Sequence, residues 1–253
     1  MAKKFPFKVY KVNKEIAETP LEALTKFVNE KKLPTYWKYT YAGRLDPMAQ
    51  GLLLVLANST QSQKEKYLNL SKVYEAEILF GFDSDTSDLL GIARKQENIE
   101  MTKNILDELV KILQSFVPKA DLPVPVFSSV PVGGKPSFHW AKLGKNPPQV
   151  KRLMEFKSIK ILKQSFVNSN QILNYLEKNI VKVKGDFRQK EILVHWKKLL
   201  KQPKEKHLVF KIWVSCGSGA YIRSLASEWG KKLGLKSLLF SLKRNQVGKY
   251  RIV

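Results

Sequence analysis

One carboxylate, that of Asp46, lies on a turn between two glycines and directly before an apolar run. Gly43 and Gly51 would let the backbone approach a ligand closely, and the run Leu52–Leu56 would anchor the turn on a buried strand. A carboxylate held rigidly in this way can act as a nucleophile. An Asp before a proline is also common in ordinary turns, where its side chain caps its own backbone.

The charge of the chain indicates the kind of molecule on which such a nucleophile would act. The 253 residues include 45 Lys and Arg against 22 Asp and Glu, a formal net charge of +23. An excess of this size is typical of proteins that neutralise phosphates, although a solvated basic surface is the plainer alternative. No segment reaches the roughly 20 apolar residues that a membrane-spanning helix needs, so we expect no membrane partner.

Thiol and imidazole groups are too few to suggest metal chemistry. The single cysteine, Cys216, excludes an internal disulfide, and the three histidines, His139, His195 and His207, are widely scattered. We therefore expect no metal site. The N-terminus lacks the apolar core of a signal peptide, and we expect a cytoplasmic protein.

One expected strand, Val73–Phe80, carries an aromatic residue and is followed by three acids. Tyr74 is either a core aromatic or, in an enzyme of nucleic acids, a platform for an extruded base, where stacking contributes roughly 1 to 3 kcal/mol. Asp83, Asp85 and Asp88 follow the strand. Their loop lacks the Gly and the distal Glu of an EF-hand, so we expect hydrogen-bond acceptors inside a site and not calcium ligands.

A glycine-rich turn, Cys216–Gly219, opens the last expected helix. Free N–H groups at such a helix start can bind an anion, but no Lys-Ser/Thr pair follows, so this is not a Walker loop. Arg223, in the first turn of the helix, could instead pair with a buried carboxylate and keep it ionised. An Arg on the surface is an equal alternative.

The elements that position these residues follow from local patterns. A capping box at Thr19–Glu22 predicts a helix that runs to about Lys31, and helical apolar spacing predicts another over Thr102–Phe116. Further strands are expected at Phe156–Leu162 and His207–Cys216, and further helices at Gln171–Lys184, Phe187–Leu200 and Ala220–Leu233.

The order of these elements predicts the fold class. Four prolines between Pro118 and Pro131 predict a loop without regular structure. No repeat or low-complexity linker divides the chain, so we expect a single domain over residues 1–253. The mixture predicts an α+β fold with a mixed, largely antiparallel central sheet flanked by helices.

Taken together, the segments resemble the TruB family of tRNA pseudouridine synthases. The resemblance rests on an ordered set of motifs: Val12–Lys14, Gly43–Leu54, Lys72–Tyr74 with Gly81, Ser84–Asp88, Pro125–Ser129 with Gly134-Lys135, Cys216–Ala226, and Leu242–Arg244 with Val247-Gly248. It implies the pseudouridine synthase catalytic fold and conversion of the T-loop uridine 55 of tRNA to pseudouridine without a cofactor.

The resemblance also implies roles for individual residues. Asp46 matches the catalytic Asp of the family, and Lys14 matches a basic residue that supports the loops of the active site. Whether the Asp attacks the sugar or acts through a glycal stays open. The full set of substrate-binding residues expected here is Lys14, Tyr41, Arg44, Tyr74, Asp88, Tyr221, Arg223 and Leu242.

Two departures from the family pattern leave alternatives open. Tyr41 stands where relatives usually carry His, and Arg44 stands where they usually carry Thr. The segment Gly43–Asp46 also resembles the RluA and RsuA families, so one alternative is a synthase that acts on ribosomal RNA or other stem-loops. A non-catalytic tRNA-binding or chaperone protein is the other. Retention of Asp46, Tyr74 and Arg223 favours the enzyme.

The resemblance extends to substrate contacts. We expect a monomer that binds the T arm of tRNA through an RNA-clamping insertion at 118–151, with no C-terminal PUA domain. A helical insertion at 171–200 is longer than the family pattern. Its cations would strengthen the grip on tRNA, namely Lys184, Arg188, Lys190, Lys197, Lys198 and Lys201.

Overall fold

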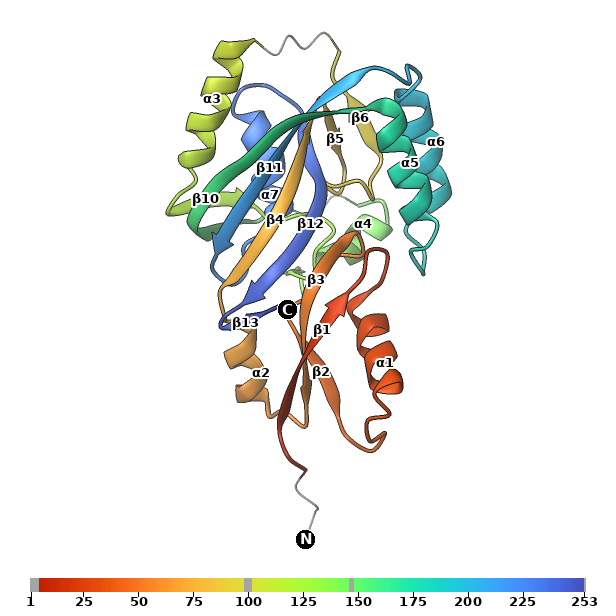
Figure 1. Ribbon diagram of the computed structural model, residues 1–253, viewed down its shortest axis with the longest axis vertical. Helices are drawn as coiled ribbons and strands as arrows, with labels where there is room; N and C mark the ends of the chain where they lie inside the picture. Colours follow the sequence, from red (N-terminus) through yellow and green to blue (C-terminus); the bar gives the residue numbers. More distant parts are fainter. Residues whose placement is uncertain (1–4, 98–101, 146–147, 253) are drawn as a thin grey trace.

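The computed structural model describes residues 5–97, 102–145 and 148–252 (Figure 1). The basic start of the chain and residues 146 and 147 of the expected clamp lie outside the described residues. In chain order the elements are β1 (Lys8–Lys14), α1 (Pro20–Glu30), β2 (Tyr39–Ala42), β3 (Ala49–Ala57), α2 (Gln61–Leu68), β4 (Lys72–Phe80), β5 (Phe82–Ser84), β6 (Ala93–Lys95), α3 (Lys103–Gln114), β7 (Lys119–Pro123), β8 (Pro131–Val132), β9 (Lys135–Pro136), α4 (Ser137–Lys142), β10 (Lys151–Asn168), α5 (Ser169–Ile180), α6 (Gln189–Leu199), β11 (Lys206–Cys216), α7 (Ile222–Lys231), β12 (Ser237–Val247) and β13 (Tyr250–Arg251).

One large sheet forms the framework of the described chain. Its strand order is β1-β3-β12-β4-β11-β10-β7, with β2 also paired to β3 and β13 to β12. The pairing of β12 with β3 is parallel, and the other pairings in this sheet are antiparallel. This architecture confirms the expected α+β fold with a mixed, largely antiparallel sheet flanked by helices.

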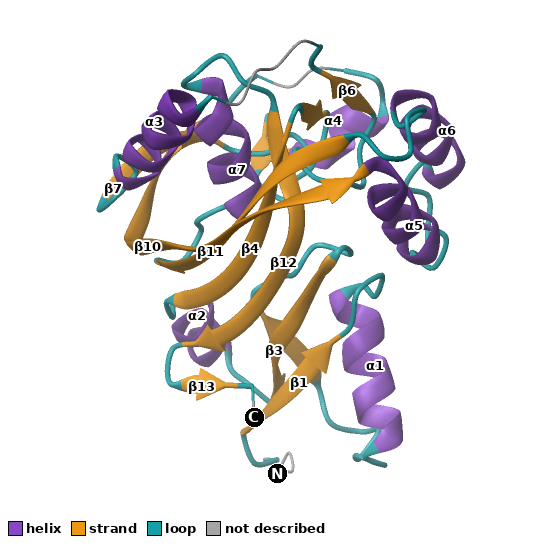
Figure 2. Cartoon of the chain, turned by 45° about the horizontal axis from the view of Figure 1, so that its top comes forward, coloured by secondary structure: helices purple, strands orange, loops and turns teal. Residues whose placement is uncertain are grey.

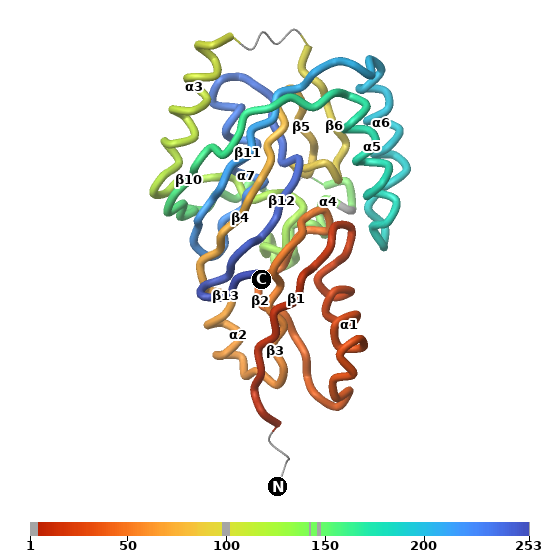
Figure 3. The backbone as a smooth tube through the Cα atoms, in the orientation of Figure 1, coloured from red at the N-terminus to blue at the C-terminus, as the bar shows by residue number. Residues whose placement is uncertain are grey.

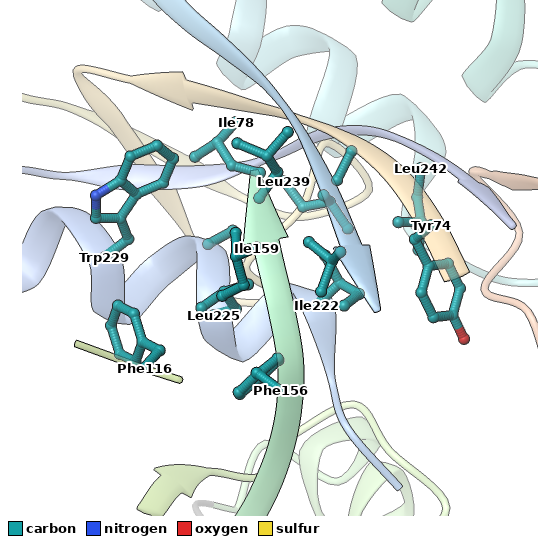
Figure 4. Packing of buried hydrophobic residues seen from close by; sticks show 14 of the residues in the cluster. Tyr74, Ile78, Phe116, Phe156, Ile159, Ile222, Leu225, Trp229, Leu239 and Leu242 are labelled. Carbon is teal, nitrogen blue, oxygen red and sulfur yellow. The ribbon is translucent and has the colours of Figure 1, made fainter. Parts of the chain in front are cut away.

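Helices cover both faces of the central strands because side chains alternate along them. On β4, Ile78 and Phe80 join a core with residues of α3 and α7, whereas Leu79 joins a second core with residues of α5 and α6. Figure 2 shows α3 and α7 together on one side and α5 with α6 on the other. Figure 4 shows the first core, in which Trp229 of α7 packs near Ile78.

The N-terminal part of the sheet has its own two small cores, one on each face of β3. Leu53 and Val55 pack beneath α1, and Leu52 and Leu54 pack on the opposite face with residues of α2 and the C-terminal segment. Because both faces of β3 are buried, its side chains form an apolar run without alternation. The run anchors the turn that carries Asp46, as the sequence predicted.

The N-terminal strands join the central strands through a short parallel junction. Only Leu242↔Ala49, Lys243↔Gln50 and Arg244↔Gly51 pair across it. The chain trace in Figure 3 shows the N-terminal strands as a lower unit beside this junction. Gly51 has φ +108°, and a Cβ there would meet the Arg244 carbonyl oxygen at 2.4 Å, so the two backbones can approach this closely only at a glycine.

Several sequence predictions need correction. The stretch expected to be a loop after Pro118 contains β7, which pairs with β10 at the last position in the strand order. Prolines are tolerated there because an edge strand leaves half of its N–H groups unpaired. The expected strand Phe156–Leu162 is the centre of the much longer β10. None of the described helices is long and apolar enough to cross a membrane.

Candidate active site

Asp46 and Arg223 form an ion pair across the junction of the sheet. Asp46 lies in the loop between β2 and β3, and Arg223 lies in the first turn of α7. The Arg223 Nη2 donates to Asp46 Oδ1 at 3.2 Å, and Nε lies 2.8 Å from Oδ2. The Arg side chain is 5% exposed and the Asp side chain is 40% exposed, so the carboxylate is oriented from below and remains open above.

Arg223 is held in place by three further oxygen atoms. Its Nη1 donates to the carbonyl of Thr86 at 3.0 Å, its Nη2 donates to the carbonyl of Phe127 at 3.1 Å, and Asp88 Oδ2 lies 3.8 Å from Nε. Burial acts to lower the pKa of Arg223, but the carboxylates of Asp46 and Asp88 outweigh it and hold that pKa above its usual value. The guanidinium is therefore a fixed positive charge beneath Asp46.

Asp88 is a second carboxylate beside the same guanidinium, but it is buried. Its Oδ1 accepts from the Thr86 hydroxyl at 2.6 Å and from the Leu90 backbone N–H at 2.9 Å. Burial raises the pKa of Asp88 to about 6, against the attraction of Arg223. The two carboxylates thus have different environments, one facing solvent and one enclosed.

Two buried cations hold the backbone of the Asp46 loop. The Lys14 Nζ donates to the carbonyls of Pro47 at 3.2 Å and Ala49 at 2.5 Å. The Arg244 guanidinium donates to the carbonyls of Gly43 at 3.2 Å, Arg44 at 3.4 Å and Leu52 at 2.7 Å. Burial lowers the pKa of Lys14 to about 8.

A cleft of about 1330 Å³ lies above Asp46. This volume exceeds that of a pocket for a single small molecule. The cleft can therefore hold a nucleotide base together with part of the sugar-phosphate backbone that carries it. Every expected site residue lines it except Lys14, which lies fully buried beneath the loop. Positive side chains outnumber carboxylates along the cleft, with Arg44, Lys64, Lys72, Arg152, Arg188, Arg223 and Arg244 against Asp46, Asp88 and Asp186.

Tyr74 and Leu242 form part of the floor of the cleft, and Figure 4 shows them side by side on β4 and β12. Tyr74 is 8% exposed. Burial raises the pKa of Tyr74 and that of Tyr221, so both phenols stay neutral at neutral pH. A neutral ring at the floor suits stacking against a base better than it suits proton abstraction.

Some expectations about the site are only partly met. Of the three clustered acids, Asp88 lines the cleft, whereas Asp83 pairs with Arg94 on the surface. The substrate-site predictions omitted Arg244 and Lys72, although both belong to motifs that were recognised. Among the described residues, no three His, Cys, Asp or Glu side chains gather where they could hold a metal ion.

Residues 30–177 match the model described as TruB family pseudouridylate synthase (N terminal domain). The chain belongs to this family. Within this TruB-family match lie Asp46, Tyr74 and Asp88, and Arg223 follows it on α7.

Curated relatives are named tRNA pseudouridine synthase B. The chain is 28% identical over 215 residues to tRNA pseudouridine synthase B of Caldicellulosiruptor saccharolyticus, covering 85% of this chain and 60% of the relative. It is 32% identical over 220 residues to that of Mesomycoplasma hyopneumoniae, covering 84% and 53%. This TruB-family chain thus spans about half to three fifths of the length of these relatives.

Solved structures agree on the fold. A chain from the crystal structure of a Cbf5-Nop10-Gar1 complex superposes with a TM-score of 0.58 at 16% identity, covering 97% of this chain and 50% of the other. A chain from the structure of an H/ACA RNP bound to a substrate RNA containing 2'-deoxyuridine gives a TM-score of 0.53 at 15% identity, covering 97% and 49%. The TruB-family chain therefore shares its architecture with both.

Proposed function

We propose that the chain is a tRNA pseudouridine synthase that isomerises the T-loop uridine at position 55. The observation that supports this most directly is the Asp46 carboxylate, held by Arg223 and open to a cation-lined cleft, in a chain of the TruB family. The reaction is an isomerisation, so it consumes no co-reactant.

In this proposal the uridine leaves its stack and enters the cleft, where the Tyr74 ring supports it. The bond between N1 of the base and C1′ of the ribose breaks with help from Asp46. The carboxylate acts either by attack on the sugar or by way of a glycal. The detached uracil rotates and its C5 bonds to C1′. The proton on C5 then leaves to solvent while N1 takes up a proton, so the product is an isomer of the substrate.

Further residues have supporting roles in this proposal. The nucleotide lies against walls shaped by Tyr41, Arg44 and Tyr221 and over Leu242 on the floor. Lys14 keeps the Asp46 loop in place. The segment 118–151 acts as the RNA clamp, since Phe127, Ser128, Ser129, Phe138 and Ala141 from it line the cleft. The T arm of tRNA is the partner that the net charge of +23 and these walls would accept.

The test is release of tritium from tRNA labelled at carbon 5 of uridine. Asp46→Asn keeps the size of the side chain and an oxygen for Arg223 but removes the carboxylate, so release should fall to background. Asp83→Asn, which removes a carboxylate outside the cleft, is the matched control and should release tritium at the wild-type rate. Release by Asp46→Asn would disprove the catalytic assignment, and no release by the wild type would favour the non-catalytic RNA binder.

One observation keeps the RluA/RsuA-like alternative in the test. The Arg44 side chain lies exposed at the cleft, two residues before Asp46. Mapping pseudouridine across total RNA after treatment with the protein separates the two substrates. Modification confined to T loops supports the tRNA proposal, whereas sites in ribosomal stem-loops favour the alternative.

A further inference from the structure

The loop between α5 and α6, residues 181–188, lies at the same cleft as Asp46. We call this loop the α5–α6 tip. Its residues Asp186, Phe187 and Arg188 line the cleft. The Nζ atom of Lys184, also in the tip, lies 3.5 Å from Oε1 of Glu22 in α1. Figure 1 shows the tip directed toward α1. The tip therefore forms a wall of the cleft on the side where α5 and α6 approach α1.

The tip is built to hold one defined shape. The Gln189 side chain donates to the carbonyls of Val183 at 2.8 Å and Gly185 at 2.7 Å, and it accepts from the backbone N–H of Phe187 at 3.1 Å. Arg188 has φ +60°, a left-handed conformation that is uncommon for a residue with a side chain. Such a conformation persists only where the surroundings fix it.

The Arg188 guanidinium lies beside the contacts that hold Arg223. Its Nη1 donates to Asp85 Oδ2 at 2.7 Å, and its Cζ lies 5.2 Å from the centre of the Phe127 ring. The carbonyl of Phe127 and that of Thr86, which follows Asp85, both accept from Arg223. Among the described residues, Asp85 accepts the hydrogen bond that the Arg188 side chain donates. The remaining N–H groups of the Arg188 guanidinium donate to none of the described residues.

The other cations of the helical region are less suited to contact RNA in the cleft. Lys197 pairs with Glu177 at 2.8 Å on the outer surface, and Lys190 is exposed away from the cleft lining. The matched family segment ends at residue 177, before the tip begins. The family match therefore assigns no role to the tip.

We propose that Arg188 binds a backbone phosphate of the RNA strand next to the extruded nucleotide, with Asp85 and Phe127 holding its guanidinium ready. A guanidinium that is already oriented loses little conformational entropy when it meets a phosphate, and its planar fork matches two phosphate oxygens. This inference rests on the proposed function for the identity of the RNA, since it assigns one phosphate of that substrate to the α5–α6 tip.

The experiment measures the Kd of the full chain for an unmodified tRNA transcript at several salt concentrations. Arg188→Gln should weaken binding roughly tenfold at 0.1 M salt and reduce the slope of log Kd against log salt by about 0.7 to 1. Arg188→Lys keeps the charge without the fork, so it should keep the wild-type slope with an intermediate Kd. Lys190→Gln, an equal loss of charge two residues away, is the matched control and should change both quantities less.

Equal effects of Arg188→Gln and Lys190→Gln would overturn the proposal, because they would indicate a diffuse basic surface. A reduced slope of log Kd against log salt in Arg188→Lys would overturn the proposal as well, since that result would point to a disrupted tip. The Kd reports binding and tritium release reports turnover, so the two proposals fail separately. Wild-type protein that binds tRNA but releases no tritium disproves the proposed activity alone, whereas wild-type protein that does not bind tRNA disproves the phosphate contact too.

Discussion

Lys14 and Arg244 donate hydrogen bonds to backbone carbonyls on opposite sides of Asp46. Lys14 reaches Pro47 and Ala49, which follow the Asp, and Arg244 reaches Gly43 and Arg44, which precede it. Both side chains are almost fully buried. The position of the carboxylate therefore depends on two buried charges that bind the backbone on either side of it.

Replacing Lys14 by Met should lower the rate of isomerisation by roughly 10- to 100-fold. The loop carbonyls would lose their buried donor, and an unsatisfied buried acceptor costs about 1 to 3 kcal/mol. Lys11→Met is the matched control, because Lys11 lies on the same strand but is exposed. Single-turnover tritium release measures both. A Lys14→Met rate equal to that of the control would show that the hydrogen bonds of Lys14 to the Asp46 loop are not needed for catalysis.

Replacing Arg223 by Lys should lower the rate by roughly 10²- to 10³-fold, because Lys keeps the charge but cannot span Asp46, Thr86 and Phe127 at once. Arg94→Lys changes an exposed Arg that makes the same two-pronged contact with Asp83, and it should leave the rate within about twofold. A rate for Arg223→Lys close to that of Arg94→Lys would contradict the role assigned to the fork.

Gly51→Ala should destabilise the fold more than an ordinary glycine replacement. The new Cβ would lie 2.4 Å from the Arg244 carbonyl oxygen at φ +108°, so β3 and β12 would have to separate. Gly234→Ala is the control, because Gly234 also has positive φ, +68°, but nothing lies near its Cβ. Urea denaturation should give a loss several kcal/mol larger for Gly51→Ala, and equal losses would refute the close approach at the junction.

Asp88 should make the protein less stable as pH rises from about 4 to about 7. Its pKa is about 6 in the folded chain and near 3.8 when unfolded, so in this interval the folded state binds more protons. The free energy of unfolding of the wild type, relative to Asp88→Asn, should therefore fall by up to about 3 kcal/mol.

Urea titrations of both proteins across this pH range measure the effect of Asp88. The Asn side chain keeps the oxygen that accepts from Thr86 and Leu90, so the comparison isolates the ionisation. A constant difference between the two proteins from pH 4 to pH 7 would mean that Asp88 does not titrate in this interval.

The sequence predicted the elements whose signals are local. The capping box at Thr19 and Glu22 is present at the start of α1, and the alternation along Val73–Phe80 is present in β4. For Arg223 the local pattern left a buried carboxylate and the protein surface as equal alternatives, and the structure pairs it with Asp46. The predictions of α1 and β4 depended on residue type and spacing within short windows.

Features that depend on pairing between distant segments were missed. Strand β7 was predicted to be a loop, because prolines signal irregular backbone unless the strand lies at an edge, which only the sheet order reveals. The buried role of Arg244 has the same origin. Nothing near it in sequence indicates that its guanidinium would reach carbonyls about 200 positions earlier in the chain.

The short parallel junction between β3 and β12 has a mechanical consequence. Asp46 belongs to the strands on one side of it, and Arg223 belongs to the helix that covers the strands on the other side. Any bending of the sheet at these three residue pairs would change the separation of the two charges. The Asp46–Arg223 ion pair thus ties the two groups of strands together beside the short stretch that joins them.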